Sequence, residues 1–536
     1  MLMKSATRSL TQQLCERFAE RIRSRLLAPG ARLPSVRLCA AQQGVSVSTV
    51  VSAYDQLQAQ GLVVARRNSG FFVREVTFIA SNSALVQWMP AQEAIKNIAT
   101  VVPINTPEAT PEGTAESAQR AGAGAPGADL PAGVQASGQA DSARETWEGM
   151  AARPAPVDAT ALIRGMFQQV SAKPQPGMGV FPPDWLETAF LPAAVRKVTT
   201  RQSLWDFSLQ YGDPRGDAGL RRALSQKLGA INVHAGPEQI ITTVGATHAL
   251  DVVSRTLLRA GDCVMVEEPG WAVEFARLDA LGMRILPVPR GPAGPDLDVM
   301  ARYCQMHRPK LFVSVSVFHN PTGYCLSPGS AHRVLQLAQQ YDFHVVEDDT
   351  YSHLAPEHAT RLCALDGLQR TIYVSGFAKI LAPGWRVGFM AAPAAMVERL
   401  LDTKLLATLT TPALLEKAVA WCIEQGQLRR HAERIRARLA QARARSVKLA
   451  LAHGCTFAAE PAGLFGWVDT GTDTDALAQR MLDEGYLIAP GSLFHAVRKP
   501  GTLMRINFAT TQDAAFWQVF ARLRDGSAST PSGPGI

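Results

Sequence analysis

The sequence predicts an α/β protein in three parts, with a mostly parallel β-sheet in the largest part. Over residues 161–525, short apolar runs alternate with amphipathic segments, the pattern of strands joined by crossover helices. Residues 77–160 are low in complexity, and residues 8–76 combine helical periodicity with two short strand-like runs. We therefore divide the 536-residue chain into a small N-terminal module, a linker and a large α/β domain.

Composition favours a water-soluble protein with a large buried core. Hydrophobic residues make up 47% of the chain. No apolar run reaches the roughly 18 residues of a membrane span, and the N-terminus lacks the apolar stretch of a secretory signal. The eight cysteines are scattered, without the paired spacing of zinc ligands. We expect a cytoplasmic protein with reduced thiols, no membrane partner and no metal site.

Positive charge is concentrated at the N-terminus. Residues 1–76 hold eleven Lys or Arg and four acidic residues, a net charge of +7, whereas the whole chain carries +8. A basic module ahead of a nearly neutral body indicates that this module alone binds a polyanion.

The N-terminal module has the pattern of a helix, a turn, a second helix and a hairpin. Ser35 can cap one helix, and Gly44 can end it at the tight turn that such a pair of helices needs. Ser46 or Ser48 can open the next helix. In such motifs the exposed start of the second helix enters the major groove of DNA, and the hairpin loop can touch phosphates or the minor groove.

Over about 65 residues, the module resembles the winged helix-turn-helix of the GntR family. The resemblance implies contacts with double-stranded DNA at Arg37, Ser46, Ser48, Thr49, Arg67, Asn68, Ser69 and Gly70. Many members carry arginine where this chain has Val47 and Val51. Valine can meet a thymine methyl group but cannot grip guanine, so we expect a different base preference. The alternative is a winged helix that serves protein contacts only, which the basic charge of the module disfavours.

The predicted linker, residues 77–160, is rich in Ala, Gly, Pro, Ser, Gln and Glu. Such a composition cannot bury enough apolar area to order the chain. A flexible chain of roughly 60 residues spans about 40–45 Å. We therefore expect the two flanking domains to move relative to each other.

Six strand-like runs and three helix-like runs support the parallel sheet. The strand-like runs are QIITTVG, DCVMVEEP, RILPVPR, LFVSVSVFHN, FHVVEDDT and TIYVSG. The helix-like runs are ATHALDVVSRTLL, PDLDVMARYCQM and AHRVLQLAQQY. From about residue 395 the chain starts with a helical region and ends with GLFGWVDT, GYLIAPGS and TLMRINFA, which predicts a small α+β domain.

Three polar motifs follow strands in the large domain. The small residues Gly245, Ala246 and Thr247 open a helix, where backbone N–H groups can hold a phosphate. Trp271 could stack on a flat ring. Asn320 follows an apolar strand at the end where α/β sheets bind ligands. Taken alone, each motif has a structural alternative: an ordinary strand–helix junction, a core tryptophan or a plain β-turn.

Five further residues could serve a phosphorylated aldehyde ring. Asp348 directly follows a buried strand, where an acid needs a partner such as a pyridinium nitrogen, and Tyr351 could reach a ring oxygen. The amine of Lys379 can form a Schiff base with an aldehyde. Arg386 can clamp a phosphate, and Arg505 can bind a carboxylate with two hydrogen bonds. An isolated lysine is usually a solvated charge, so Lys379 is a candidate only because these motifs occur together in a fixed order.

Together the motifs resemble the fold-type I pyridoxal-phosphate enzymes, the class I/II aspartate aminotransferase superfamily, over roughly residues 175–520. The resemblance implies pyridoxal 5′-phosphate as cofactor and Lys379 as the catalytic residue that carries it. It implies cofactor contacts from Gly245, Ala246, Thr247, Trp271, Asn320, Asp348, Tyr351, Ser375 and Arg386. Arg505 would take the substrate or effector carboxylate. Tyr211 resembles the tyrosine that reaches the cofactor phosphate of the neighbouring subunit, which implies a homodimer.

One part of the cofactor motif departs from the family pattern. Relatives usually have Ser or Thr three residues before the lysine, where this chain has Gly376. Ser375 lies one step earlier, and Ala378 replaces a common Ser. We expect the backbone amides and Arg386 to preserve cofactor binding, with a changed affinity.

The order of winged helix, linker and aminotransferase-like domain resembles the MocR subfamily of bacterial transcription regulators. The resemblance implies a regulator whose large domain senses pyridoxal phosphate, an amino acid or an amine. Two alternatives stay open. One is a working aminotransferase with a secondary DNA-binding module, and the other is a sensor of the cofactor itself.

Overall fold

The computed structural model describes residues 9–23, 27, 30–66, 70–74 and 173–526. The predicted linker lies outside these ranges. So do Arg67, Asn68 and Ser69 of the predicted wing.

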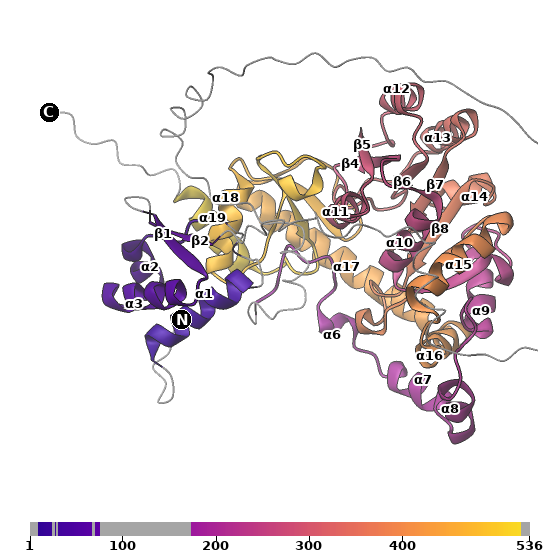
Figure 1. Cartoon of the computed structure of the whole chain (residues 1–536), viewed down its shortest axis with the longest axis horizontal. Helices are drawn as coiled ribbons and strands as arrows, with labels where there is room; N and C mark the ends of the chain where they lie inside the picture. Colours follow the sequence, from indigo (N-terminus) through magenta and orange to yellow (C-terminus); the bar gives the residue numbers. More distant parts are fainter. Residues whose placement is uncertain (1–8, 24–26, 28–29, 67–69, 75–172, 527–536) are drawn as a thin grey trace, which may run out of the picture. The chain divides into compact units, whose positions relative to one another are not determined.

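The N-terminal module consists of three helices and a two-stranded hairpin (Figure 1). The elements are α1 (Leu10–Arg23), α2 (Val36–Gln43), α3 (Val47–Ala59), β1 (Val63–Arg66) and β2 (Gly70–Val73), with the two strands antiparallel. The Ser35 side chain caps α2 by accepting from the Leu38 N–H, and Gly44 ends the helix at φ 63°. Ser46 caps α3. The expected helix, turn, helix and hairpin are therefore present.

A seven-stranded sheet forms the centre of the large domain. In order across the sheet, the strands are β3 (Ile240–Val244), β9 (Val387–Ala391), β8 (Thr371–Gly376), β7 (His344–Asp348), β6 (Leu311–Ser314), β4 (Cys263–Glu268) and β5 (Arg284–Pro289). The pairs from β8 to β5 are all parallel. Only β9 runs antiparallel to its neighbours. The predicted mostly parallel sheet is confirmed.

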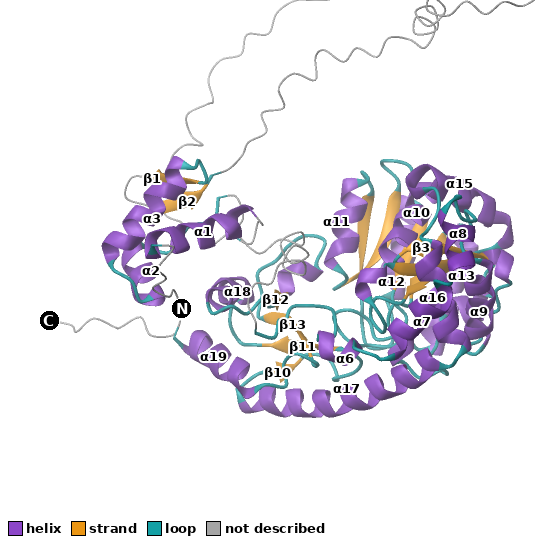
Figure 2. Ribbon diagram, turned by 90° about the horizontal axis from the view of Figure 1, so that it is seen from below, coloured by secondary structure: helices purple, strands orange, loops and turns teal. Residues whose placement is uncertain are grey.

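Helices flank this sheet (Figure 2). The helices up to the small domain are α6 (Pro183–Leu186), α7 (Phe190–Val198), α8 (Arg201–Ser208), α9 (Ala218–Gly229), α10 (Ala246–Leu257), α11 (Ala272–Ala280), α12 (Leu297–His307), α13 (Pro328–Tyr341), α14 (Leu362–Asp366), α15 (Val397–Thr408) and α16 (Ala413–Glu424). Both faces of the sheet are buried, as a parallel sheet requires. On β4, for example, Val264 and Val266 join one core cluster, whereas Cys263 and Met265 join another.

The small C-terminal domain begins with the 26-residue helix α17 (Gln427–Ala452), the long curved helix of Figure 2. Its antiparallel sheet has the order β10 (Thr456–Phe457), β11 (Phe465–Asp469), β13 (Leu503–Asn507) and β12 (Ala489–Pro490). Helices α18 (Thr474–Asp483) and α19 (Ala514–Asp525) complete it. In the part of the chain described here, no helix is long and apolar enough to cross a membrane.

Candidate functional site

The candidate site lies where three parallel strands end. Asp348 is the last residue of β7, and Asn320 and Lys379 lie in the segments that follow β6 and β8. Arg505, on β13 of the small domain, hydrogen-bonds to Asn320. Four residues that are far apart in the sequence therefore meet at the carboxyl end of the sheet, the usual ligand-binding edge of such folds.

Lys379 is half-buried, and its Nζ donates to the carbonyl oxygen of Gly179 at 2.7 Å. The pKa of the Lys379 amine is lowered to about 8, mainly by burial and also by the charge of Arg505, whereas Asp348 opposes both. A lysine with such a pKa is partly neutral near neutral pH. It can therefore act as a nucleophile toward a carbonyl carbon.

Asp348 is held by its own turn. The Thr350 N–H donates to Asp348 Oδ1 at 3.0 Å, and the Thr350 hydroxyl donates to the same oxygen. The pKa of the Asp348 carboxyl is raised to about 6, mainly by burial, although the Thr350 hydrogen bonds lower it. A small hollow lies beside it, lined by Trp271, Glu267, Glu274 and His319 together with apolar side chains. Trp271 and Asp348 thus line the same hollow.

Arg505 is 3% exposed and is fixed on several sides. Its Nη1 donates to Asn320 Oδ1 at 2.9 Å, and its Nη2 donates to the Gly177 carbonyl oxygen at 2.5 Å. The guanidinium carbon lies 4.4 Å and 5.1 Å from the ring centres of Phe465 and Phe494. Burial lowers the pKa of Arg505 to about 10, and its Nε is buried without a hydrogen-bond partner in the described structure. This unpaired donor fits an incoming anion.

Tyr351 is buried beside Asn320. The two side chains are hydrogen-bonded, and burial raises the pKa of the Tyr351 phenol. The Phe465 ring meets Tyr351 edge-on, with ring centres 5.5 Å apart. Asn320 therefore links two side chains, because it binds both Tyr351 and Arg505.

The predicted phosphate site combines a helix start with an arginine. Gly245 caps α10 at φ 81°, and Ala246 and Thr247 are the first residues of that helix. The exposed Arg386 donates to the Val244 carbonyl oxygen at 3.3 Å. A Cβ atom on Gly245 would lie 2.4 Å from Arg386 Nη2, so the guanidinium lies directly against this glycine. Free N–H groups of a first helical turn and a guanidinium together suit a phosphate.

The side chain of Ser375 does not join the predicted phosphate site. Its hydroxyl donates to the Asp349 carbonyl oxygen at 2.9 Å. Successive strand residues point to opposite faces, so Gly376 occupies the face toward α10. A Cβ atom there would lie 3.5 Å from Ala246 N. The hydroxyl of Ser375 therefore does not replace the one that relatives have at position 376.

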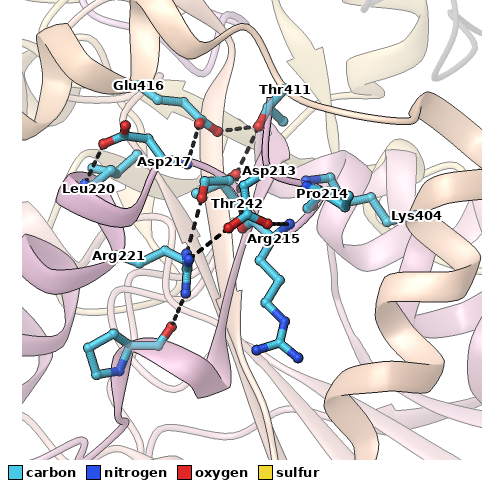
Figure 3. A network of polar contacts seen from close by, with 12 residues as sticks. Asp213, Pro214, Arg215, Asp217, Leu220, Arg221, Thr242, Lys404, Thr411 and Glu416 are labelled. Carbon is cyan, nitrogen blue, oxygen red and sulfur yellow. Dashed lines mark hydrogen bonds and ion pairs between the residues drawn. The ribbon is translucent and has the colours of Figure 1, made fainter. Parts of the chain in front are cut away.

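Tyr211 is 82% exposed. The loop that follows it is fixed by the polar network of Figure 3. There Arg221 donates to the Asp213 carboxylate at 3.0 Å, and the fully buried Lys404 donates to the Pro214 carbonyl oxygen at 2.5 Å. Burial lowers the pKa of Lys404 to about 8. The chain thus presents an exposed tyrosine on a well-anchored loop.

Sequence reasoning missed Gly177 and Gly179. They contact Arg505 and Lys379 through backbone carbonyls, which no side-chain motif reveals. The glycine-rich run KPQPGMGV was the available signal. His319, which directly precedes Asn320, is 1% exposed and lies 3.0 Å from the Thr322 hydroxyl, so it has a structural role in this turn.

In the N-terminal module, the predicted contact residues lie on exposed parts. Arg37 is exposed on α2, and Ser46 and Ser48 are exposed at the start of α3, with Thr49 half-buried beside them. Gly70 opens β2 at φ 101°, a conformation that favours glycine.

The fold and the site define a fold-type I aminotransferase-like protein with a winged helix-turn-helix ahead of it. Residues 184–523 match the family Aminotransferase class I and II, and residues 10–73 match the family Bacterial regulatory proteins, gntR family. The chain therefore belongs to the class I and II aminotransferases and carries a GntR-type DNA-binding domain, a domain order consistent with the MocR subfamily.

Similar proteins fall into two groups. The chain is 31% identical to a 2-aminoadipate transaminase of Thermus thermophilus over 57% of this chain and 78% of that protein. It is 27% identical to YdcR of Escherichia coli, an uncharacterized HTH-type transcriptional regulator, over 93% of this chain and 94% of that protein. Among solved structures, it resembles the α-aminoadipate aminotransferase LysN of Thermus thermophilus, complexed with N-(5′-phosphopyridoxyl)-L-leucine. That likeness has a TM-score of 0.62 and 25% identity, and covers 68% of this chain and 94% of that one.

Proposed function

We propose that the protein is a DNA-binding transcription regulator that depends on pyridoxal phosphate, and that its large domain senses an amino acid or amine. The observation that carries the proposal is the assembly of Lys379, Asp348 and Arg505 at one sheet edge in a chain that also has a winged helix. The similarity to YdcR supports it, because that similarity extends over both domains.

The residues at the site fit the cofactor. Lys379 has an amine of lowered pKa, and Asp348 lies beside Trp271 at the hollow. The Gly245 turn and Arg386 would hold the phosphate. When bound, pyridoxal phosphate supplies an electron sink through its ring.

Arg505 would bind the carboxylate of the effector. The guanidinium is buried, and its Nε has no partner in the described structure, so a carboxylate would satisfy a donor that is otherwise costly to bury. A carboxylate that also takes Nη2 replaces the Gly177 carbonyl as its partner. Effector binding would then alter the segment with Gly177 and Gly179, whose carbonyl oxygens bind Arg505 and Lys379.

We also propose a homodimer in which Tyr211 reaches the partner's cofactor phosphate. Its high exposure and anchored loop support this role. Three other exposed apolar residues come just before it in the chain, which are Leu204, Trp205 and Leu209. A dimer would carry two winged helices for two DNA half-sites.

An absorption spectrum of the purified protein, titrated with amino acids and amines, tests this function. We expect a visible band from the cofactor bound at Lys379, which one compound shifts lastingly without forming an oxo acid. The same compound should change the affinity of the protein for operator DNA. No band, or a band retained in Lys379→Ala, would contradict the proposal. If DNA affinity changes with the cofactor alone, the effector is pyridoxal phosphate itself.

A second candidate function is transamination. The complete set of Lys379, Asp348 and Arg505, together with the 31% identity to a transaminase, favours it. The same titration separates the two functions. An amino acid would bleach the visible band, a 2-oxo acid would restore it, and a new amino acid would accumulate over many turnovers.

A further inference from the structure

The start of α3 has an unusual surface for a DNA-reading helix. Val47 is 50% exposed and Val51 is 39% exposed, and residues four apart lie on the same helix face. Neither belongs to the core of the module, to which α3 contributes Val50, Tyr54 and Leu57 instead. The helix VSTVVSAYDQLQA contains no lysine or arginine. Its exposed leading face therefore presents branched apolar side chains in place of cations.

The polar side chains around these valines are short and bound to one another. The Ser46 hydroxyl accepts from the Thr49 N–H at 3.1 Å. It also lies 2.9 Å from the Ser48 hydroxyl and 2.8 Å from the Thr49 hydroxyl. The Ser46 hydroxyl thus caps the helix, and the other two hydroxyls are bound to it. None of them can form the two-donor contact that selects guanine.

The charges that would hold DNA lie on other elements of the module. Arg37 is exposed on α2, and Arg66 is exposed at the end of β1. Phosphate contacts position a protein on the duplex but carry no sequence information directly. Affinity and base selection are therefore divided between different residues, with the valines in the position to read bases.

Major-groove edges offer valine one apolar partner, the C5-methyl group of a pyrimidine. In unmodified DNA only thymine carries this group. We propose that Val47 and Val51 form a methyl-reading surface that selects thymines in each operator half-site. This inference rests on the proposed function, because it assumes that α3 enters the major groove.

The test uses the full-length protein and needs no knowledge of the operator. Duplexes with a randomised stretch of two helical turns are selected for binding. The thymines of the selected sequence are then replaced one at a time by uracil, which removes only the methyl group. We expect uracil to weaken binding about fourfold at each contacted position, the worth of one buried methyl group. In Val47→Ser or Val51→Ser, uracil should cost no further affinity at the position that the lost side chain contacts.

A matched control is Val497→Thr, a polar change at a 70% exposed valine of the small domain. This variant should keep the full difference between thymine and uracil. Selected DNA that binds equally well with thymine or uracil would overturn the inference while leaving the DNA-binding function intact. Failure to retain any DNA would instead contradict the function itself.

A third duplex series carries 5-methylcytosine in place of cytosine. Tighter binding there, with no loss for uracil, would assign the surface to methylated cytosine and overturn the choice of thymine.

Discussion

Arg505 illustrates how single residues set the chemistry of the candidate site. It is a buried cation whose hydrogen bonds go to neutral oxygens of Asn320 and Gly177, so its charge is not neutralised by these partners. Burying a charge without an opposite charge is costly. An anion that binds there would recover this cost, and we therefore propose Arg505 as the residue that senses a carboxylate.

We predict that Arg505→Ala weakens the response to amino acids about tenfold or more and leaves cofactor binding in place. The reason is the loss of a charge-assisted contact with the effector carboxylate, whereas the groups that would hold the phosphate stay in place. The visible band measures cofactor binding, and its shift measures the response. Arg505→Lys is the matched variant, because it keeps the charge but lacks the two-pronged geometry. Loss of the band itself in both variants would refute this role.

The Lys379 amine should set the pH dependence of cofactor binding. It must be neutral to attack the cofactor aldehyde, and its pKa is lowered to about 8. The rate at which the apoprotein acquires the visible band should therefore rise with pH up to about 8 and level off above it. Stopped-flow absorption at constant ionic strength measures this profile. A rate that still climbs steadily toward pH 10 would show that the lysine is not activated.

At the scale of elements, β9 determines how closely the phosphate loop is packed. Gly388 lies on this strand between β3 and β8. A Cβ atom on Gly388 would lie 2.4 Å from the Gly245 carbonyl carbon and 2.7 Å from Ala246 N. The antiparallel strand thus supports the backbone that would bind phosphate, and only glycine leaves room for this approach.

We predict that Gly388→Ala displaces this loop, lowers cofactor affinity and destabilises the domain by about 1–3 kcal/mol. Cofactor titration and thermal unfolding measure the two effects. Gly384→Ala is the control, since a Cβ atom there meets nothing within 4 Å. Equal cofactor affinity in the two variants would mean that the loop is not the phosphate site.

These elements also show what could be predicted from sequence. Strands β4 and β7 are apolar runs followed by acids, so periodicity revealed them and placed Asp348 at a strand end. Strand β9 was missed, because a glycine interrupts its short apolar run and its antiparallel direction follows from no local pattern. The partnership of Arg505 with Gly177 was missed as well. It joins residues 328 positions apart through a backbone atom, which leaves no side-chain signature.

At the scale of the whole molecule, the proposed dimer makes each site depend on two chains. Tyr211 would act in the partner's site, whereas Lys379 acts in its own. An exposed tyrosine on a loop anchored by Lys404 and Arg221 has little structural reason to be there in a single chain. Its position is explained if a second copy completes the contact.

We predict that mixing two defective variants restores one working site. Tyr211→Phe should bind the cofactor weakly, and Lys379→Ala should give no visible band. In a mixed dimer, the intact Lys379 of one chain meets the intact Tyr211 of the other. Titration of differently tagged, co-purified dimers should then give one site of wild-type affinity per dimer. Weak binding in the mixed dimer, like that of Tyr211→Phe alone, would place Tyr211 in its own subunit's site.

The contacts of Gly177 and Gly179 have a consequence for how the protein can evolve. Because Arg505 and Lys379 are bound by main-chain oxygens, exchanging most side chains between residues 173 and 180 would leave both contacts in place. Inserting or deleting a residue there would move both oxygens at once. Gly177 itself is fixed, since a Cβ atom would lie 2.6 Å from the backbone of Ile488. Natural selection should therefore conserve the length of this segment and Gly177 more strictly than the identities of its other residues.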